Sequence, residues 1–275
     1  MAIGNPSPTL ADTDVPAQAR DFAVADRVVI VTGSGQGIGR ELARQFAAAG
    51  AISVIADLSK QNADAVAAEI TQAGGKALSI AVDVSDRDSV GAMVSAVIAQ
   101  FGRIDTLVNN ASLFSSLIKK PFEEITTAEW QQVMNVNVNG VFFCASAVAP
   151  KMRAQGFGRI INISSASVHR GTRNYLHYVT SKSALIGMTN SLARELGADG
   201  VTVNCIRPGT VATEVAERVA NLTPGILQRN IELQCIPRTI VPSDLVGVTM
   251  FLATPAASFI TGQTIACDGG YTHSF

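Results

Sequence analysis

The sequence predicts a single-domain α/β protein built on a doubly wound, mostly parallel sheet of seven strands. Seven short runs rich in β-branched residues recur along the 275-residue chain. Most of them are continuously apolar, which is typical of strands covered on both faces. Helical patterns separate these runs, and repeated strand–helix–strand units imply right-handed crossovers into one parallel sheet. Neither a Pro/Ser-rich linker nor an internal repeat interrupts the pattern, which favours one domain.

Local patterns predict the elements in chain order. The expected strands are residues 27–32, 52–56, 77–82, 106–108, 159–163, 201–206 and 264–267. After the first strand, Ile38, Leu42 and Phe46 recur every four residues, so they share one face of a helix. Helical stretches rich in alanine and valine follow at 63–73 and 89–101, and glycines directly after them are expected to end both helices.

Two segments stand outside this regular pattern. Residues 1–24 contain Pro, Asp and Thr and predict a flexible N-terminal arm in front of a domain at 25–275. Inside the domain, a long and less regular insertion at about 210–239 precedes the last helix.

Composition excludes several classes of protein. Hydrophobic residues make up 47% of the chain and charged residues 16%, with a net charge of -1. A nucleic-acid-binding protein needs a basic surplus, and a disordered chain needs low hydrophobicity with high net charge. The uncharged stretches 130–150 and 245–267 are long enough to cross a membrane, but both carry polar residues that hydrocarbon disfavours. The N-terminus lacks the basic and apolar regions of a signal peptide, so we expect a cytoplasmic protein.

Cysteine and histidine patterns predict neither a disulfide framework nor a metal site. The four cysteines lie at least 30 positions apart, and no C-x-x-C pair occurs. The three histidines form no H-E-x-x-H motif and have no cysteine nearby in the sequence. We therefore expect the cysteines to be small buried hydrophobic residues and expect no zinc.

A glycine-rich loop joins the first strand to the first helix. Gly33, Gly37 and Gly39 stand where backbone N–H groups and a helix N-terminus can hold a pyrophosphate, although Ile38 breaks the G-x-G-x-x-G spacing. Asp57 follows Gly39 by 18 residues and ends the second strand, where an acidic residue accepts hydrogen bonds from a ribose. The alternative is that Asp57 caps the next helix. A carboxylate at this position repels a 2′-phosphate, so the pattern favours NAD over NADP.

Two flanking residues bear on that choice of cofactor. Gln36 in the loop is neutral and supplies no cation for a 2′-phosphate, whereas Lys60 is the nearest cation that could.

A second constellation combines Ser165, Tyr178 and Lys182. Tyr178 and Lys182 are four residues apart and lie on one helical face. A neighbouring ammonium favours the phenolate and lowers the pKa of a tyrosine, which makes it a usable acid or base. Taken alone, the pair is weak evidence, and a solvated helix face is the better interpretation of it.

Together these motifs resemble the short-chain dehydrogenase/reductase family from about residue 25 to residue 270. Thr32-Gly33-x-x-x-Gly37-x-Gly39 resembles the family's cofactor loop, and Asp83-Val84 resembles the pair that ends its third strand. Its N-N-A-G and P-G motifs are matched by Asn109-Asn110-Ala111-Ser112 and Pro208-Gly209-Thr210-Val211-Ala212-Thr213. Two segments resemble its closing strand, Ile260-Thr261-Gly262-Gln263 and Asp268-Gly269-Gly270. Ser112 departs from the family by replacing a glycine.

The resemblance implies a Rossmann fold and assigns the site residues. Catalysis falls to Tyr178 as acid and base, Ser165 on the substrate oxygen, Lys182 on the tyrosine and the nicotinamide ribose, and Asn137 in a proton relay. Residues implied to contact the cofactor are Gly33, Gln36, Gly37, Ile38, Gly39, Asp57, Leu58, Asp83, Val84, Asn110, Ala111, Ser112, Tyr178, Lys182, Pro208, Gly209, Val211 and Thr213.

The substrate pocket is expected at Leu113, Phe114, 167–174 and 211–234. The last segment is apolar and predicts either a lid over a hydrophobic substrate or a packing helix pair; its apolar residues are Val211, Val215, Val219, Leu222, Ile226, Leu227 and Leu233. His169 and His177 flank the catalytic residues and either touch the substrate or are ordinary polar residues near the surface. Arg170 and Arg173 either meet an anionic substrate or face solvent.

Segments 177–204 and 237–270 look closest to NAD-linked secondary-alcohol dehydrogenases, 1-phenylethanol dehydrogenases among them. The resemblance therefore implies oxidation of a hydrophobic or cyclic secondary alcohol to its ketone. The alternatives are a 3-oxoacyl thioester reductase, which usually prefers NADPH, and a non-catalytic dinucleotide-binding regulator. The two uncharged stretches fall where the family forms homotetramers, which implies self-association rather than a membrane partner.

Overall fold

The computed structural model describes residues 22–214 and 225–273 and has one parallel sheet at its centre. Its seven strands lie in the order β3-β2-β1-β4-β5-β6-β7, and every neighbouring pair is parallel. The strands are β1 (Val28–Thr32), β2 (Ile52–Asp57), β3 (Lys76–Ala81), β4 (Thr106–Asn109), β5 (Gly158–Ile163), β6 (Val201–Pro208) and β7 (Thr264–Cys267). The predicted seven-stranded doubly wound sheet is confirmed.

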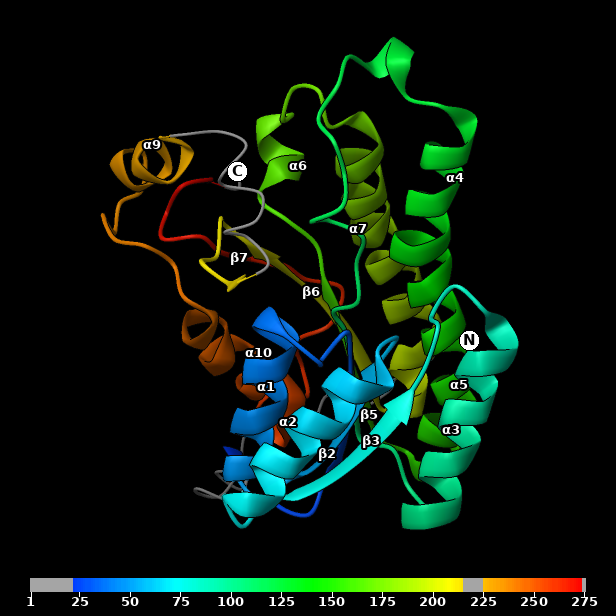
Figure 1. Cartoon of the computed structure of the whole chain (residues 1–275). Coiled ribbons are helices and arrows are strands. Elements are labelled where there is room, and N and C mark those ends of the chain that lie inside the picture. The colour runs from blue at the N-terminus through cyan, green and yellow to red at the C-terminus, as the bar shows by residue number, and fades with distance from the viewer. Residues whose placement is uncertain (1–21, 215–224, 274–275) are drawn as a thin grey trace, which may run out of the picture.

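Helices cover both faces of the sheet (Figure 1). They are α1 (Gly37–Ala48), α2 (Lys60–Gln72), α3 (Arg87–Phe101), α4 (Thr127–Met134), α5 (Gly140–Gln155), α6 (Ser167–Arg170), α7 (Leu176–Leu196), α9 (Ile226–Glu232) and α10 (Val246–Ala253). Helices α1, α2 and α10 form one layer, while α3, α5 and α7 form the other. Successive side chains of β1 point to opposite faces of the sheet, so the sheet separates two hydrophobic cores. Val28 and Ile30 pack on the α3 side, whereas Val29 and Val31 pack on the α1 side.

The crossover from β3 to β4 places a switch point at the carboxyl end of the sheet. Strand β1 lies between β2 and β4, so the chain leaves β1 toward one edge and later returns to build the other edge. Loops after β1 and β4 therefore diverge, and in open α/β sheets ligands bind in the crevice that this divergence opens.

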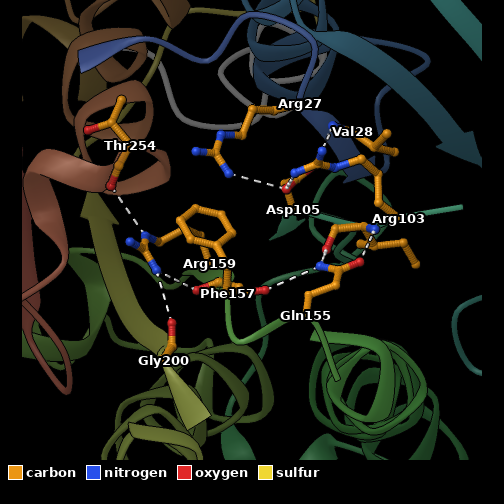
Figure 2. Close-up of polar contacts among 11 residues, drawn as sticks. Arg27, Val28, Arg103, Asp105, Gln155, Phe157, Arg159, Gly200 and Thr254 are labelled. Carbon is orange, nitrogen blue, oxygen red and sulfur yellow. Dashed lines mark hydrogen bonds and ion pairs between the residues drawn. The ribbon is translucent and has the colours of Figure 1, made fainter. Parts of the chain in front are cut away.

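Asp105 lies at the opposite, amino edge of the sheet and ties three strands together (Figure 2). Its carboxylate is fully buried and accepts hydrogen bonds from Val28 N (2.9 Å), Arg27 Nη1 (3.3 Å) and Arg103 Nη2 (2.6 Å). The guanidinium groups of Arg27 and Arg159 each lie 4.1 Å from the ring centre of Phe157. This cluster fixes the edge that faces away from the crevice.

A continuous helical run from Thr127 to Gln155 joins α4 to α5 through a π-helical turn at Asn135–Asn139. By length and hydropathy alone it suits a membrane span, a test that core helices of soluble proteins also pass. Here it packs against α3 and α7.

The last residues of the predicted N-terminal arm are part of the domain. Val24 is 4% exposed and belongs to the core on the α1 side, and the ring of Phe22 stacks on Phe251 with centroids 6.5 Å apart. Contacts with the domain thus extend back to residue 22. The boundary between arm and domain at residue 25 stays a prediction. Residues 1–21 and 215–224 lie outside the described residues.

Candidate active site

A cavity of about 1080 Å³ occupies the crevice at the carboxyl ends of the strands. It runs from the glycine loop after β1 to Tyr178 on α7 and on to α9. Every residue implied to contact a dinucleotide lines this cavity except Gly39. The fold therefore brings residues from six separate loops and helices to a single pocket.

Gly39 acts in packing rather than at the cavity wall. A Cβ atom on Gly39 would lie 2.3 Å from the Gly33 carbonyl oxygen and 2.6 Å from the Asn110 amide nitrogen. Its missing side chain lets the loop close over α1. The cofactor contact expected of Gly39 stays a prediction. Gly33 has φ +63°, and a Cβ there would lie 2.8 Å from Ala111 Cα.

Asn110 braces the glycine loop from the end of β4. Its side-chain Nδ2 donates to the carbonyl oxygens of Thr32 and Gly33, each at 3.0 Å. In return, Thr32 Oγ1 accepts from the backbone N–H groups of Asn110 and Ala111, each at 3.1 Å. Ser112, which replaces the family's glycine, donates weakly to the Leu113 carbonyl at 3.4 Å and disturbs none of these bonds.

Asp57 points into the same end of the cavity. Its carboxylate accepts from Gly35 N at 2.8 Å and from Ser59 N at 2.9 Å. Ser59, not Asp57, is the N-cap of α2, since its side chain accepts from Asn62 N. Lys60, the cation that could favour a 2′-phosphate, forms an ion pair with Asp64.

Gly35 is also needed at the dinucleotide end of the cavity, although the sequence motifs did not identify it. A Cβ atom on Gly35 would lie 2.9 Å from the Asp57 carboxylate and 2.7 Å from Asn62 Cβ. The loop can approach Asp57 only because Gly35 has no side chain.

Tyr178 lies in an aromatic stack beside the cavity and is 7% exposed. Its ring centre is 4.8 Å from that of Tyr175 and 5.4 Å from that of Phe114. Tyr175 locks this stack by donating its hydroxyl to the Phe114 carbonyl at 3.0 Å. Ser165 lines the cavity and shares a hydrogen bond with the Tyr178 side chain. Sequence patterns did not reveal Tyr175, whose role depends on this contact across loops.

Lys182 lies one helical turn beyond Tyr178 and is 3% exposed. Its Nζ donates to the Ile163 carbonyl at 2.8 Å and lies 5.9 Å from the Tyr178 ring centre. Burial lowers the pKa of Lys182 to about 8. Ser164 donates to the Lys182 carbonyl at 2.7 Å and so fixes this turn of α7.

The pKa of Tyr178 is raised to about 12, opposite to the expected direction. The dominant cause is burial, which disfavours a phenolate among apolar rings. The hydrogen bond with Ser165 acts in the lowering direction, but burial outweighs it. Lys182 directs its ammonium to a carbonyl oxygen, which explains why the pKa of Tyr178 does not fall.

Asn137 lies in the π-helical turn beneath the cavity and is fully buried. Its amide accepts from Leu113 N at 2.7 Å and donates to Leu113 O at 3.2 Å and to Ser181 Oγ at 3.0 Å. Asn137 thus fixes the Leu113 loop against α7, directly before Lys182. Its side chain does not line the cavity, and its part in a proton relay stays a prediction.

The described lining of the substrate end contains both apolar and polar residues. Leu113, Phe114, Ser167, the segment 170–173 and Val211 line it as expected, but α9 contributes Arg229 and Asn230. Leu233 is 56% exposed and lies outside the cavity lining. Val215, Val219 and Leu222 fall outside the described residues, as do the side chains of Ile226 and Leu227.

Neither candidate histidine lines the cavity. His169 contacts the buried Arg207, and burial together with that cation lowers its pKa. His177 is 2% exposed, so it is a core residue rather than a surface one, and burial lowers its pKa as well.

Comparison with known proteins gives matches over nearly the whole chain. The family model described as enoyl-(acyl carrier protein) reductase matches residues 33–272. A 3-oxoacyl-[acyl-carrier-protein] reductase of Synechocystis is 39% identical over 255 residues, covering 90% of this chain and 98% of that protein. Cis-4-hydroxycyclohexanecarboxylate dehydrogenase of Sinomonas cyclohexanicum is 37% identical over 250 residues, covering 91% and 98%.

A solved structure with the same fold was determined with a bound nicotinamide cofactor. The 7α-hydroxysteroid dehydrogenase complexed with NADH and 7-oxo glycochenodeoxycholic acid matches with a TM-score of 0.87 and 32% identity, covering 93% of this chain and 98% of the other. With the cavity geometry, these matches show that the chain is an oxidoreductase of the short-chain dehydrogenase/reductase family, whose Rossmann-like fold takes a nicotinamide dinucleotide.

Proposed function

We propose that this enzyme uses NAD to interconvert a hydrophobic or cyclic secondary alcohol and its ketone. The observation that carries the proposal is the single cavity that contains Asp57 at one end and the Ser165–Tyr178 pair at the other. One end suits a ribose with a free 2′-hydroxyl, and the other suits an alcohol oxygen.

The residues present fit a nicotinamide dinucleotide. Gly33 and Gly37 have positive φ values and open the backbone at the N-terminus of α1, which favours a pyrophosphate. Lys182 has three N–H donors, and only its bond to Ile163 O is made among residues 22–214 and 225–273, so it retains donors for ribose hydroxyls. Pro208, Gly209 and Thr213 line the wall where the family holds the carboxamide.

The Ser165–Tyr178 pair performs the proton chemistry at the substrate oxygen. During oxidation, Ser165 donates a hydrogen bond to the alcohol oxygen and positions it, and Tyr178 in its phenolate form takes the hydroxyl proton. The cofactor supplies the hydride acceptor when bound. In reduction, the neutral Tyr178 returns the proton to the oxygen. Because its pKa is raised to about 12, Tyr178 is protonated at neutral pH and already in the acid form.

Asp57 supports NAD rather than NADP as the cofactor. Its carboxylate lies at the carboxyl end of β2, held by Gly35 N and Ser59 N, and would repel a 2′-phosphate. Lys60 is engaged by Asp64, so it offers no competing attraction.

A secondary alcohol on a ring is supported by the aromatic wall and by two relatives. Phe114 and Tyr175 present flat apolar surfaces beside Tyr178. The Sinomonas relative is named for a hydroxycyclohexane ring, and the steroid dehydrogenase was solved with a polycyclic oxo compound. A second candidate, reduction of a 3-oxoacyl thioester, is favoured by the 39% identity to the Synechocystis reductase.

The test is a panel of cyclic, aromatic and linear secondary alcohols with NAD⁺ or NADP⁺, read by absorbance of the reduced cofactor. We expect turnover of cyclic or aryl alcohols with a clear NAD⁺ preference. Efficient reduction of acetoacetyl-CoA with NADPH, and none of the alcohols oxidised, supports the second candidate instead. If neither set reacts while NAD⁺ binds, the chain is a non-catalytic dinucleotide-binding protein.

We also propose that the enzyme is a homotetramer. Phe142 is 45% exposed and Phe259 is fully exposed, and they fall in the uncharged stretches 130–150 and 245–267 respectively. Exposed aromatic residues without neighbouring charge favour subunit burial. Light scattering tests the proposal, and a monomer at micromolar concentration refutes it.

A further inference from the structure

Four cationic side chains line the substrate end of the cavity. Lys119 comes from the loop before α4, Arg170 from α6, Arg173 from the α6–α7 loop and Arg229 from α9. All four residues are exposed. Helices α6 and α9 stand over the carboxyl edge of the sheet (Figure 1). Segments far apart in the sequence thus contribute cationic residues to the lining of the same cavity.

These cations lack acidic partners. Among residues 22–214 and 225–273, none of the four forms an ion pair, whereas other exposed arginines such as Arg40, Arg153 and Arg238 do. The acidic residues in the described lining are Asp57 and Asp83, both at the dinucleotide end. Within residues 22–214 and 225–273, the lining of the substrate end therefore carries four cationic residues and no acidic one.

Arg170 is held in place by neutral groups. Its Nη1 donates to Asn230 Oδ1 at 3.2 Å and to the Tyr271 hydroxyl at 3.1 Å, and its guanidinium lies 4.8 Å from the Tyr271 ring centre. These contacts orient the guanidinium without neutralising it. Lys119 is similarly placed, with Nζ 5.6 Å from the ring centre of Tyr175, which itself stacks on Tyr178.

Hydroxyl groups without partners lie among the cations. Ser167 is 5% exposed, lines the cavity, and its Oγ has no hydrogen-bond partner in the described structure. Thr172 Oγ1, between Arg170 and Arg173 in the chain, is likewise buried and unpartnered at the cavity wall. A buried hydroxyl without a partner carries a free-energy cost that an oxygen-rich ligand relieves.

We propose that the substrate is an anion, a hydroxy acid and its oxo acid, whose carboxylate lies at the end formed by Lys119, Arg170, Arg173 and Arg229. This inference rests on the proposed function and names its substrate class. The aromatic wall at Phe114 and Tyr175 contacts the apolar body of the substrate, while the cations and the free hydroxyls bind the carboxylate. Clustered positive charge at a cavity mouth also raises the local concentration of an anion.

The experiment compares each acid with its own methyl ester, which keeps the shape and removes the charge. Suitable pairs are cis-4-hydroxycyclohexanecarboxylate, a 3-hydroxy fatty acid and a hydroxysteroid carboxylic acid, each beside its ester with saturating NAD⁺. We expect kcat/KM of at least one acid to exceed that of its ester, mainly through KM, with the advantage falling as NaCl is added.

Variants Arg173→Gln and Arg229→Gln, alone and combined, test the residues themselves. In the double variant we expect the acid-to-ester ratio of kcat/KM to fall about tenfold. This is the scale expected when two exposed ion pairs between the arginines and the substrate carboxylate are lost. Arg170 is left intact because its side chain also holds Asn230 and Tyr271. Arg194→Gln is the matched control, since Arg194 is exposed on α7 and lies outside the cavity lining.

The outcomes separate this inference from the proposed function. Esters oxidised as well as the acids, or an acid-to-ester ratio that the double variant leaves unchanged, overturn the anionic substrate and leave the alcohol dehydrogenase intact. No NADH from any acid, ester or neutral alcohol refutes the proposed function, and this inference falls with it. A fall in the ratio in the double variant but not in Arg194→Gln supports the carboxylate site.

Discussion

The carboxylate of Glu214 accepts a hydrogen bond of 2.8 Å from the backbone N–H of Gly37. Gly37 is the first residue of α1, where the partial positive charge of the helix favours an anion. The same N–H belongs to the loop expected to hold a cofactor pyrophosphate. A side chain from the P-G loop thus satisfies the donor that a phosphate oxygen requires.

This contact predicts that Glu214 weakens cofactor binding. Replacing Glu214 by Gln removes a negative charge that competes with the pyrophosphate, so we expect the Kd for NAD⁺ to fall about threefold, the scale of one exposed charge at a helix terminus. Titration calorimetry measures the Kd, and high salt should shrink the difference. Glu195→Gln, an exposed change on α7, is the control. Equal or weaker binding by Glu214→Gln contradicts the competition.

Removing the hydroxyl of Tyr178 should stop turnover and spare cofactor binding. Tyr178→Phe keeps the ring that stacks on Tyr175 and Phe114, so the pocket retains its shape. We expect nearly complete loss of kcat with an unchanged Kd for NAD⁺. Tyr175→Phe is the informative comparison, because it removes the bond to the Phe114 carbonyl but no proton-transfer group. Rates like those of the native enzyme in Tyr178→Phe would remove Tyr178 from the mechanism.

Asp57 should determine the choice between NAD and NADP. Asp57→Asn keeps the side-chain shape and removes the charge, so we expect the preference for NAD⁺ over NADP⁺ to fall by at least about tenfold, the scale of one like-charge contact. Asp83→Asn removes a charge at the same end of the cavity and should weaken both cofactors alike. An unchanged preference in Asp57→Asn, or an equal change in Asp83→Asn, would show that Asp57 does not discriminate.

Local sequence patterns were enough to predict the sheet and the dinucleotide end. Continuous apolar runs identify buried parallel strands, and all seven expected ranges overlap observed strands. Gly33 and Asp57 were identifiable because the loops at the carboxyl ends of β1 and β2 must meet. Those residues depend on the topology of the fold, which periodicity reveals. Asn110 was assigned through the resemblance to the family's N-N-A-G motif.

Residues that depend on side-chain packing between distant segments could not be predicted. Tyr175 matters through its stack with Tyr178 and its bond to Phe114, 61 residues away. Glu214 reaches Gly37 across 177 residues. The pKa of Tyr178 was predicted in the wrong direction because a four-residue spacing reveals the nearby ammonium but not the burial of the phenol.

Burial of Lys182 predicts that stability depends on pH above neutrality. The pKa of Lys182 is lowered from 10.5 to about 8, so between these values the unfolded chain binds more protons than the native one. This group's contribution to the free energy of unfolding therefore rises with pH there, by at most about 1.4 kcal/mol per pH unit. Burial raises the pKa values of Cys144 and Cys205, which act in the opposite direction above pH 9.

The Lys182→Met variant isolates this contribution. The difference in unfolding free energy, native minus variant, should increase from pH 8 to pH 9.5, and below pH 8 the variant should be the more stable protein. Urea unfolding without added nucleotide measures both proteins at each pH. Parallel pH profiles for the two proteins would mean that Lys182 carries no shifted pKa.

Asp105 should be required for stability and dispensable for chemistry. Its buried carboxylate accepts from Val28 N and the guanidinium groups of Arg27 and Arg103 at the edge of the sheet opposite the cavity (Figure 2). Asp105→Asn turns a buried amide N–H toward groups that themselves donate, and it removes the charge that pairs with the half-buried Arg27 and the exposed Arg103. We therefore expect a loss of about 2 kcal/mol in unfolding free energy. Asp26→Asn breaks the exposed pair with Lys76 and should leave stability unchanged within error. Urea unfolding compares the two variants, and kcat of the folded Asp105→Asn protein should match that of the native enzyme. Equal stability of the two variants would show that the buried cluster does not hold the sheet edge together.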